Sequence, residues 1–218
     1  MLTTLRSELR DGWKQMLAWG IGFALLTQGM MLAALCIRFL AVPNYVVFYD
    51  WPGNVATIID STPSVSDMLP IIAGEWLIEI GQMNYSWGNG ISVWALNVVP
   101  AKLLLLFAVG ALVCLCRRLL RQDSCPGTLR NGAGVATGLG VGLVALTNAT
   151  MSWVVCCATP NWVVGLAMMG LGVSTSLALE PYGTVLAISG FGLLALAVLA
   201  LAWRKSRNTD FHGEPTHA

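Results

Sequence analysis

Two cysteines stand side by side in the run Cys156-Cys157-Ala158-Thr159-Pro160. Consecutive Cα atoms lie about 3.8 Å apart, which is less than the roughly 4.4–6.8 Å found across disulfides. We therefore expect two free thiols, and an adjacent pair of thiolates suits one soft metal ion better than Mg²⁺ or Ca²⁺. Thr159 and Pro160 have the residue types of a helix N-cap and first helical position, and a helix N-terminus favours thiolate. Two small buried hydrophobic residues are the alternative interpretation, because free cysteine packs well in cores.

A second group of cysteines, Cys114, Cys116 and Cys125, lies at the end of an apolar run and in the basic segment after it. These thiols are weaker candidates for a metal site on the other side of a membrane, and we favour incidental packing for them. Cys36 stands alone in an earlier apolar run and is expected to serve packing. The sequence contains no HExxH motif, P-loop or Ser/His/Asp set, so we expect no enzyme.

Three motifs around the vicinal cysteines occur in a recognisable order. They are Cys156-Cys157-x-x-Pro160, Leu179-Glu180-Pro181-Tyr182 and Ala202-Trp203-Arg204. Over about residues 145–207 the chain thereby resembles the mercuric-ion transport proteins of bacterial mercury-resistance operons. The resemblance implies that Cys156 and Cys157 receive Hg(II) as a dithiolate and that a cytoplasmic cysteine pair accepts the ion. That family has its cytoplasmic pair after the Ala-Trp-Arg helix, where this chain has no cysteine.

The chain as a whole is too apolar for a soluble domain. Of its 218 residues, 56% are hydrophobic and 11% are charged, whereas a soluble domain has about 25% charged residues. The formal net charge of +1 argues against nucleic acid as a partner. A bilayer admits only helices or closed barrels. Because the apolar runs are long and period-two alternation is absent, the expected fold is an all-α polytopic membrane protein.

The apolar runs predict four or five transmembrane helices, since a span needs about 20 residues. The runs cover residues 17–42, 98–116, 132–152, 160–179 and 184–203. The short, glycine-rich run 160–179 is the one expected to be re-entrant. In the third run Gly134, Gly138 and Gly142 form a repeated GxxxG pattern, which predicts a face that lies close to another helix.

Charge gives the expected orientation. Basic residues in 1–14 and 117–130 assign both segments to the cytoplasm. Residues 43–97 contain acids, Trp and Tyr but no Lys or Arg, which predicts an external loop; 66–83 within it is expected to be an amphipathic interfacial helix. Five spans would leave the basic C-terminal end outside, against the positive-inside tendency.

These observations predict three regions: a two-span region 1–131 with the external loop, a mercury-transporter-like region 132–207, and a disordered tail 208–218. The expected function is binding and translocation of a soft ion, Hg(II) or Cu(I), across the bacterial inner (cytoplasmic) membrane, with no resident cofactor. The alternative is a non-enzymatic accessory subunit of a larger membrane complex. The expected partners are the lipid bilayer and either a membrane protein or further copies of this chain in a homo-oligomer. A membrane thiol-redox protein is a third interpretation, disfavoured because neighbouring cysteines form a strained disulfide.

Overall fold

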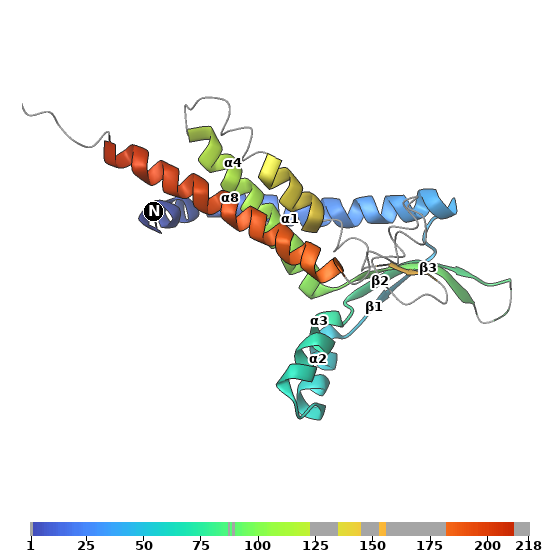
Figure 1. Ribbon diagram of the computed structural model, residues 1–218. Coiled ribbons are helices and arrows are strands. Elements are labelled where there is room, and N and C mark those ends of the chain that lie inside the picture. The colour runs from blue at the N-terminus through green and yellow to red at the C-terminus, as the bar shows by residue number, and fades with distance from the viewer. Residues whose placement is uncertain are drawn as a thin grey trace, which may run out of the picture. The chain divides into compact units, whose positions relative to one another are not determined.

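The computed structural model describes residues 2–86, 88, 90–122, 135–144, 153–155 and 182–211. The elements are α1 (Leu2–Phe39), β1 (Tyr45–Phe48), α2 (Trp51–Ser61), α3 (Val65–Gly74), β2 (Ile78–Asn84), β3 (Ile91–Val98), α4 (Pro100–Gln122), β4 (Trp153–Val155) and α8 (Gly183–Phe211), with a short apolar helix Val135–Val144 (Figure 1). Contacts divide the chain into two units. One comprises Met1–Phe23, Phe107–Ala145 and Thr184–Ala218, and the other Ala24–Leu106 and Leu146–Gly183.

Three helices in the described ranges are long and apolar enough to cross a membrane: Arg6–Phe39, Pro100–Leu120 and Val185–Ser206. They correspond to the first, second and last predicted runs, which confirms the expectation of apolar helices of membrane-spanning length. Of the predicted run 132–152, the helix Val135–Val144 is described and is shorter than a span. The run 160–179 lies outside the described residues.

The first unit is a helical bundle built from the N-terminal part of α1, the C-terminal part of α4, α8 and the short helix. Its core consists of Met16, Cys114, Leu115, Cys116, Leu119, Ala197, Val198, Leu201 and Ala202. Glycines bring α1 and α4 close together: a Cβ added at Gly20 would lie 2.5 Å from the Phe107 ring, and one at Gly110 would lie 2.7 Å from the Trp19 carbonyl oxygen. Small residues permit such close approach of apolar helices.

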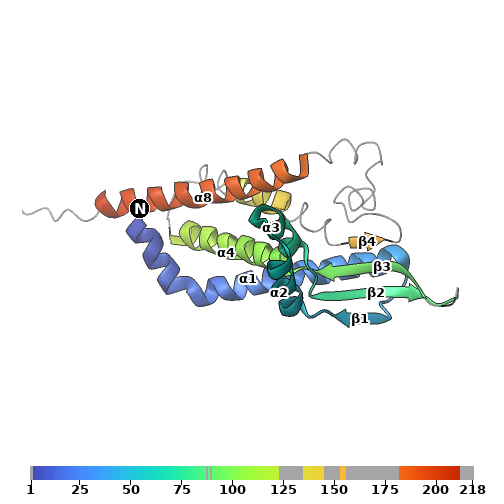
Figure 2. The ribbon, with the colours of Figure 1, turned by 90° about the horizontal axis from the view of Figure 1, so that it is seen from below.

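The second unit contains an antiparallel sheet, so the expectation of an all-α fold is wrong. The strand order is β1-β2-β3-β4 (Figure 2), and the register includes Ile80 opposite Leu96 and Trp94 opposite Val155. β3 is difficult to recognise in the sequence because residues 94–97 are all buried. A strand covered on both faces reads as a continuous apolar run without alternation.

The predicted interfacial helix 66–83 is only partly present. α3 ends at Gly74, and residues from Ile78 onward form β2 instead. Isoleucine suits a strand, and pairing with β3 outweighs the weak helical periodicity of the segment. The preceding helix α2 begins where the Asp50 side chain accepts a hydrogen bond from the Gly53 amide, which caps the helix.

Two structural findings bear on the predicted regions. α8 continues through Phe211, four residues into the predicted disordered tail, and residues 212–218 lie outside the described part. The contact-based units also interleave along the chain, since the first 23 residues group with α8. The start of the chain and its last helix therefore belong to one packed body.

Candidate functional site

The vicinal cysteines Cys156 and Cys157 lie outside the described residues, and so does Cys125. The described chain approaches the pair through β4, whose last residue is Val155. Val155 lies opposite Trp94 of β3. The chain is thus hydrogen-bonded into the sheet one residue before Cys156.

The strand that receives β4 is held by a buried aromatic residue. Trp94 is fully buried in a cluster with Leu35 and Leu96, and its indole Nε1 donates a hydrogen bond to Gln82 Oε1 at 3.1 Å. The Trp94 and Phe39 rings stack with centroids 6.5 Å apart. Cys36 packs against the same cluster, in agreement with the packing role expected for it. β3 is therefore a firmly packed support for β4.

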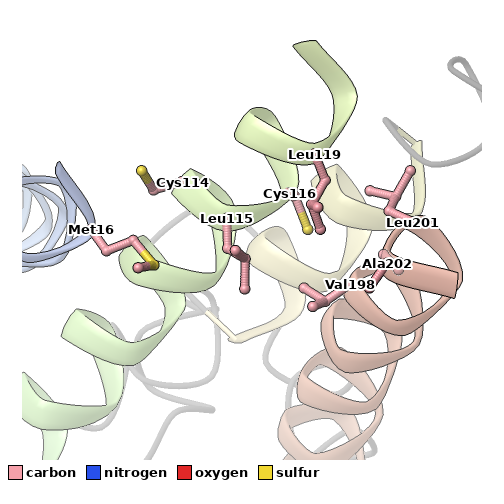
Figure 3. Close-up of a cluster of buried hydrophobic side chains, with 9 residues drawn as sticks. Met16, Cys114, Leu115, Cys116, Leu119, Val198, Leu201 and Ala202 are labelled. Carbon is pink, nitrogen blue, oxygen red and sulfur yellow. The ribbon is translucent and has the colours of Figure 1, made fainter. Parts of the chain in front are cut away.

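Cys114 and Cys116 are both buried in the core of the first unit, each with 1% of its surface exposed. Figure 3 shows Cys114 on the side of α4 near Met16 and Cys116 on the side near Val198 and Ala202 of α8. Residues two apart in a helix do not face each other, so α4 does not bring these thiols onto one face. Within the described ranges, no group of three or more His, Cys, Asp or Glu residues is arranged to hold a metal ion.

A buried carboxylate joins three helices in the first unit. Glu8 of α1 is 7% exposed and accepts hydrogen bonds from Arg118 Nε of α4, at 3.2 Å, and from Lys205 Nζ of α8. Arg118 Nη1 also donates to Gln15 Oε1 at 3.3 Å. Gly12 leaves the space for this guanidinium, since a Cβ there would lie 2.7 Å from Nη1. One acid thus links the basic ends of three helices.

The sequence contains a signal for this network. Glu8, Gly12 and Met16 are spaced four residues apart and share one helix face. That face is buried. An acid on a buried face requires cationic partners, and the nearby arginines and lysines were interpreted only as signals of orientation.

A second carboxylate, Glu79 of β2, is shared by two tyrosines of the second unit. Tyr45 Oη donates to Glu79 Oε1 at 2.7 Å, and Tyr49 donates to the other oxygen, Oε2. The hydrogen bond to Glu79 raises the pKa of Tyr49 to about 12, and burial raises the pKa of Tyr45. Gly81 admits the Tyr45 side chain, since a Cβ would lie 2.6 Å from its hydroxyl. This network ties β1 and the segment after it to β2.

The tyrosines should make the sheet sensitive to alkali. Because the pKa of Tyr49 is raised in the folded state, its contribution to the free energy of unfolding is complete below about pH 10, the ordinary tyrosine pKa. It is lost as the pH rises through about 12. We expect Tyr49→Phe to lower the free energy of unfolding at pH 8 by about 1 kcal/mol. Between pH 10 and 12 the melting temperature of Tyr49→Phe should fall less steeply than that of the control Tyr85→Phe. An unchanged alkaline slope in Tyr49→Phe would contradict this role.

Comparisons with protein-family models, with curated proteins and with solved structures find no match to this chain. A functional interpretation therefore rests on the residues of the chain itself: the vicinal thiols, the sheet that precedes them and the charged helix ends.

Proposed function

We propose that this protein binds a soft metal ion, Hg(II) or Cu(I), through Cys156 and Cys157 and moves it across the bacterial inner membrane. The observation that carries the proposal is the vicinal pair followed by Pro160, the Leu-Glu-Pro-Tyr junction and the final Ala-Trp-Arg helix, in the order seen in mercuric-ion transport proteins. Thiolates select soft cations, and the transported ion is the substrate rather than a resident cofactor.

The proposal includes an even number of membrane crossings. Glu8, near the start of α1, is ion-paired with Arg118 near the end of α4 and with Lys205 near the end of α8. These ion pairs support a common side for all three helix ends, and the basic residues there favour the cytoplasm. Five crossings from a cytoplasmic N-terminus would leave Lys205 outside, so we propose four. The positive-inside conflict then disappears.

The short helix Val135–Val144 is the third crossing, or part of it, in this proposal. A Cβ at Gly140 would lie 2.9 Å from the Leu194 side chain, and one at Gly190 would lie 2.8 Å from Val144. As residue numbers increase along this helix, the numbers of the α8 residues that it contacts decrease. The two helices are therefore antiparallel, which supports crossings in opposite directions. The run 160–179 then begins and ends on the outer side, as a re-entrant segment does. In this proposal Cys156 and Cys157 are reached from that outer side, where an incoming ion arrives.

Topology can be tested by labelling single cysteines in a cysteine-replaced background. We expect Ser61→Cys, at the end of α2, to react with a membrane-impermeant maleimide from outside intact cells. Ser206→Cys, beside Lys205 in α8, should react only after the membrane is permeabilised so that the reagent reaches the cytoplasmic side. Labelling of the Ser206 position from outside would exclude an even number of crossings.

Uptake of Hg(II) by cells that produce the chain tests the function directly. Uptake above that of cells without the protein, dependent on Cys156, is the expected result. If cells with the protein take up no more Hg(II) than cells without it, the second candidate function is favoured, an accessory subunit of a larger membrane complex.

One observation favours that second candidate. Neither α2 nor α3 has a buried residue in the described part of the chain, and Ile59, Val65, Leu69 and Ile71 are each at least 49% exposed. A membrane-protein partner would cover such a surface. Stoichiometric co-purification with another membrane protein, lost when Leu69→Asp is introduced, would support the accessory role.

A further inference from the structure

The N-terminal helix is longer than a membrane requires. α1 has 38 residues and is about 57 Å long at 1.5 Å per residue, whereas the hydrocarbon core of a bilayer is about 30 Å thick. Its apolar run begins near Leu17, and the part from there to Phe39 is long enough to span. Glu8 in the part before Leu17 is ion-paired with Arg118 and Lys205, near the basic ends of α4 and α8. Basic residues gather where helices leave the bilayer, which favours a place at the headgroup level for this part of α1.

This first part of α1 carries three parallel stripes of residues spaced four apart. One stripe is basic and exposed: Arg6, Arg10 and Lys14. The neighbouring stripe is apolar and exposed, with Leu9 43%, Trp13 54% and Leu17 42% accessible. The third stripe, which begins with Glu8, is buried against the helical bundle. An exposed apolar stripe beside a basic one is the pattern of helices that lie in the membrane interface.

The net positive charge of this segment favours an anionic ligand. Its acids are Glu8 and Asp11, and Glu8 is already ion-paired with Arg118 and Lys205 from other helices. The basic stripe thus carries more positive charge than Asp11 can balance. Lys14 Nζ lies 5.8 Å from the centroid of the Trp13 ring, so a cation and an aromatic side chain meet where headgroups lie.

We propose that the stripe Arg6–Arg10–Lys14, together with Leu9, Trp13 and Leu17, binds anionic phospholipids of the inner leaflet. The apolar stripe lies among the first methylene groups of the acyl chains. The three cations extend to the lipid phosphates, as long basic side chains do at interfaces. Phosphatidylcholine, which has no net charge, lacks the Coulomb attraction and is bound less tightly.

The test uses the full chain in detergent, titrated with phosphatidylglycerol or with phosphatidylcholine of identical acyl chains, with bound lipid counted by native mass spectrometry. A basic residue near an anionic surface contributes about fivefold to the binding constant. We expect the wild type to retain phosphatidylglycerol preferentially, Arg10→Gln to lower that preference by about fivefold, and the triple variant with Arg6→Gln, Arg10→Gln and Lys14→Gln to remove most of it.

Two variants serve as matched controls. Arg10→Lys keeps the charge and should keep the preference. Arg38→Gln removes an exposed cation from the other end of the same helix and should leave the preference unchanged. Equal retention of the two lipids by the wild type, an undiminished preference in the triple variant, or an equal loss in Arg38→Gln would each overturn the proposal.

Discussion

Replacing either Cys156 or Cys157 by serine is expected to abolish Hg(II) uptake by cells and tight Hg(II) binding by the purified protein. Two adjacent thiolates clamp one soft ion, and a serine hydroxyl is a hard ligand that does not replace a thiolate. Loss of even an outer-shell partner typically weakens metal binding by about 10–100-fold. Loss of one of two direct ligands should therefore weaken binding by more than about a hundredfold.

The other cysteines provide controls. Cys36→Ser removes a thiol packed against the Trp94 cluster, and Cys114→Ser removes one buried in the helical core. Both should retain the tight Hg(II) site in a titration of the purified chain, although each can lower its stability. Unchanged tight binding in both vicinal variants would refute the site and leave the accessory-subunit role as the better explanation.

The apolar helices of membrane-spanning length were predictable because a long apolar run is a simple sequence signature. An uninterrupted apolar run long enough to cross is visible in the sequence without knowledge of any tertiary contact. Accordingly, the predicted runs 98–116 and 184–203 correspond to the helices Pro100–Leu120 and Val185–Ser206. Most of the predicted run 17–42 likewise lies within α1, which ends at Phe39.

The sheet was not predictable from alternation because its strands are set by pairing rather than by a solvent-facing pattern. Trp94, Ala95 and Leu96 are consecutive and all buried. β4 has only three residues, too few for any periodicity. Its pairing with β3 joins positions 61 residues apart in the chain, Trp94 and Val155. Such contacts are tertiary and are not encoded in the local sequence.

The candidate site was predictable only as far as residue chemistry determines it. The thiol pair follows from its own adjacency, without any knowledge of the fold. The link between Glu8, Arg118 and Lys205 joins residues up to 197 positions apart and needs the helices to be packed. Charge patterns assigned each helix end separately and left the topological conflict, which the proposed four crossings would remove.

Gly140→Leu is expected to destabilise the helical unit strongly, whereas Gly138→Leu is expected to be nearly neutral. The repeated GxxxG pattern had pointed to Gly134, Gly138 and Gly142 as the packed face. Gly134 lies outside the described residues, and in the described part of the chain Gly138 and Gly142 are exposed, so the prediction is not borne out there. A Cβ at either position would meet no described atom within 4 Å. At Gly140 it would lie 2.8 Å from the Gly190 carbonyl oxygen, closer than real Cβ contacts.

The error has a physical origin in the sequence. Glycine occurs at 138, 140 and 142, so the helix carries two stripes of small residues on different faces. One contains Gly138 and Gly142; the other contains Ala136 and Gly140. Spacing identifies both stripes equally well, and only the opposing helix decides between them. Gly190 of α8 meets the second, since a Cβ there would lie 2.9 Å from the Gly140 carbonyl oxygen.

Alanine variants isolate the contact from the other effects of losing a glycine. Gly138→Ala and Gly140→Ala both raise helix propensity by up to about 1 kcal/mol and add the same methyl group. Their difference therefore reports the helix–helix contact. Forcing backbone atoms apart typically costs about 1–3 kcal/mol, so Gly140→Ala should melt below the wild type in detergent while Gly138→Ala melts at or above it. Gly140→Leu should melt lower still, because its longer side chain also meets Leu194. Equal melting temperatures for the two alanine variants would show that the short helix and α8 do not pack through Gly140 and Gly190, and would remove the support that this contact gives to antiparallel crossings.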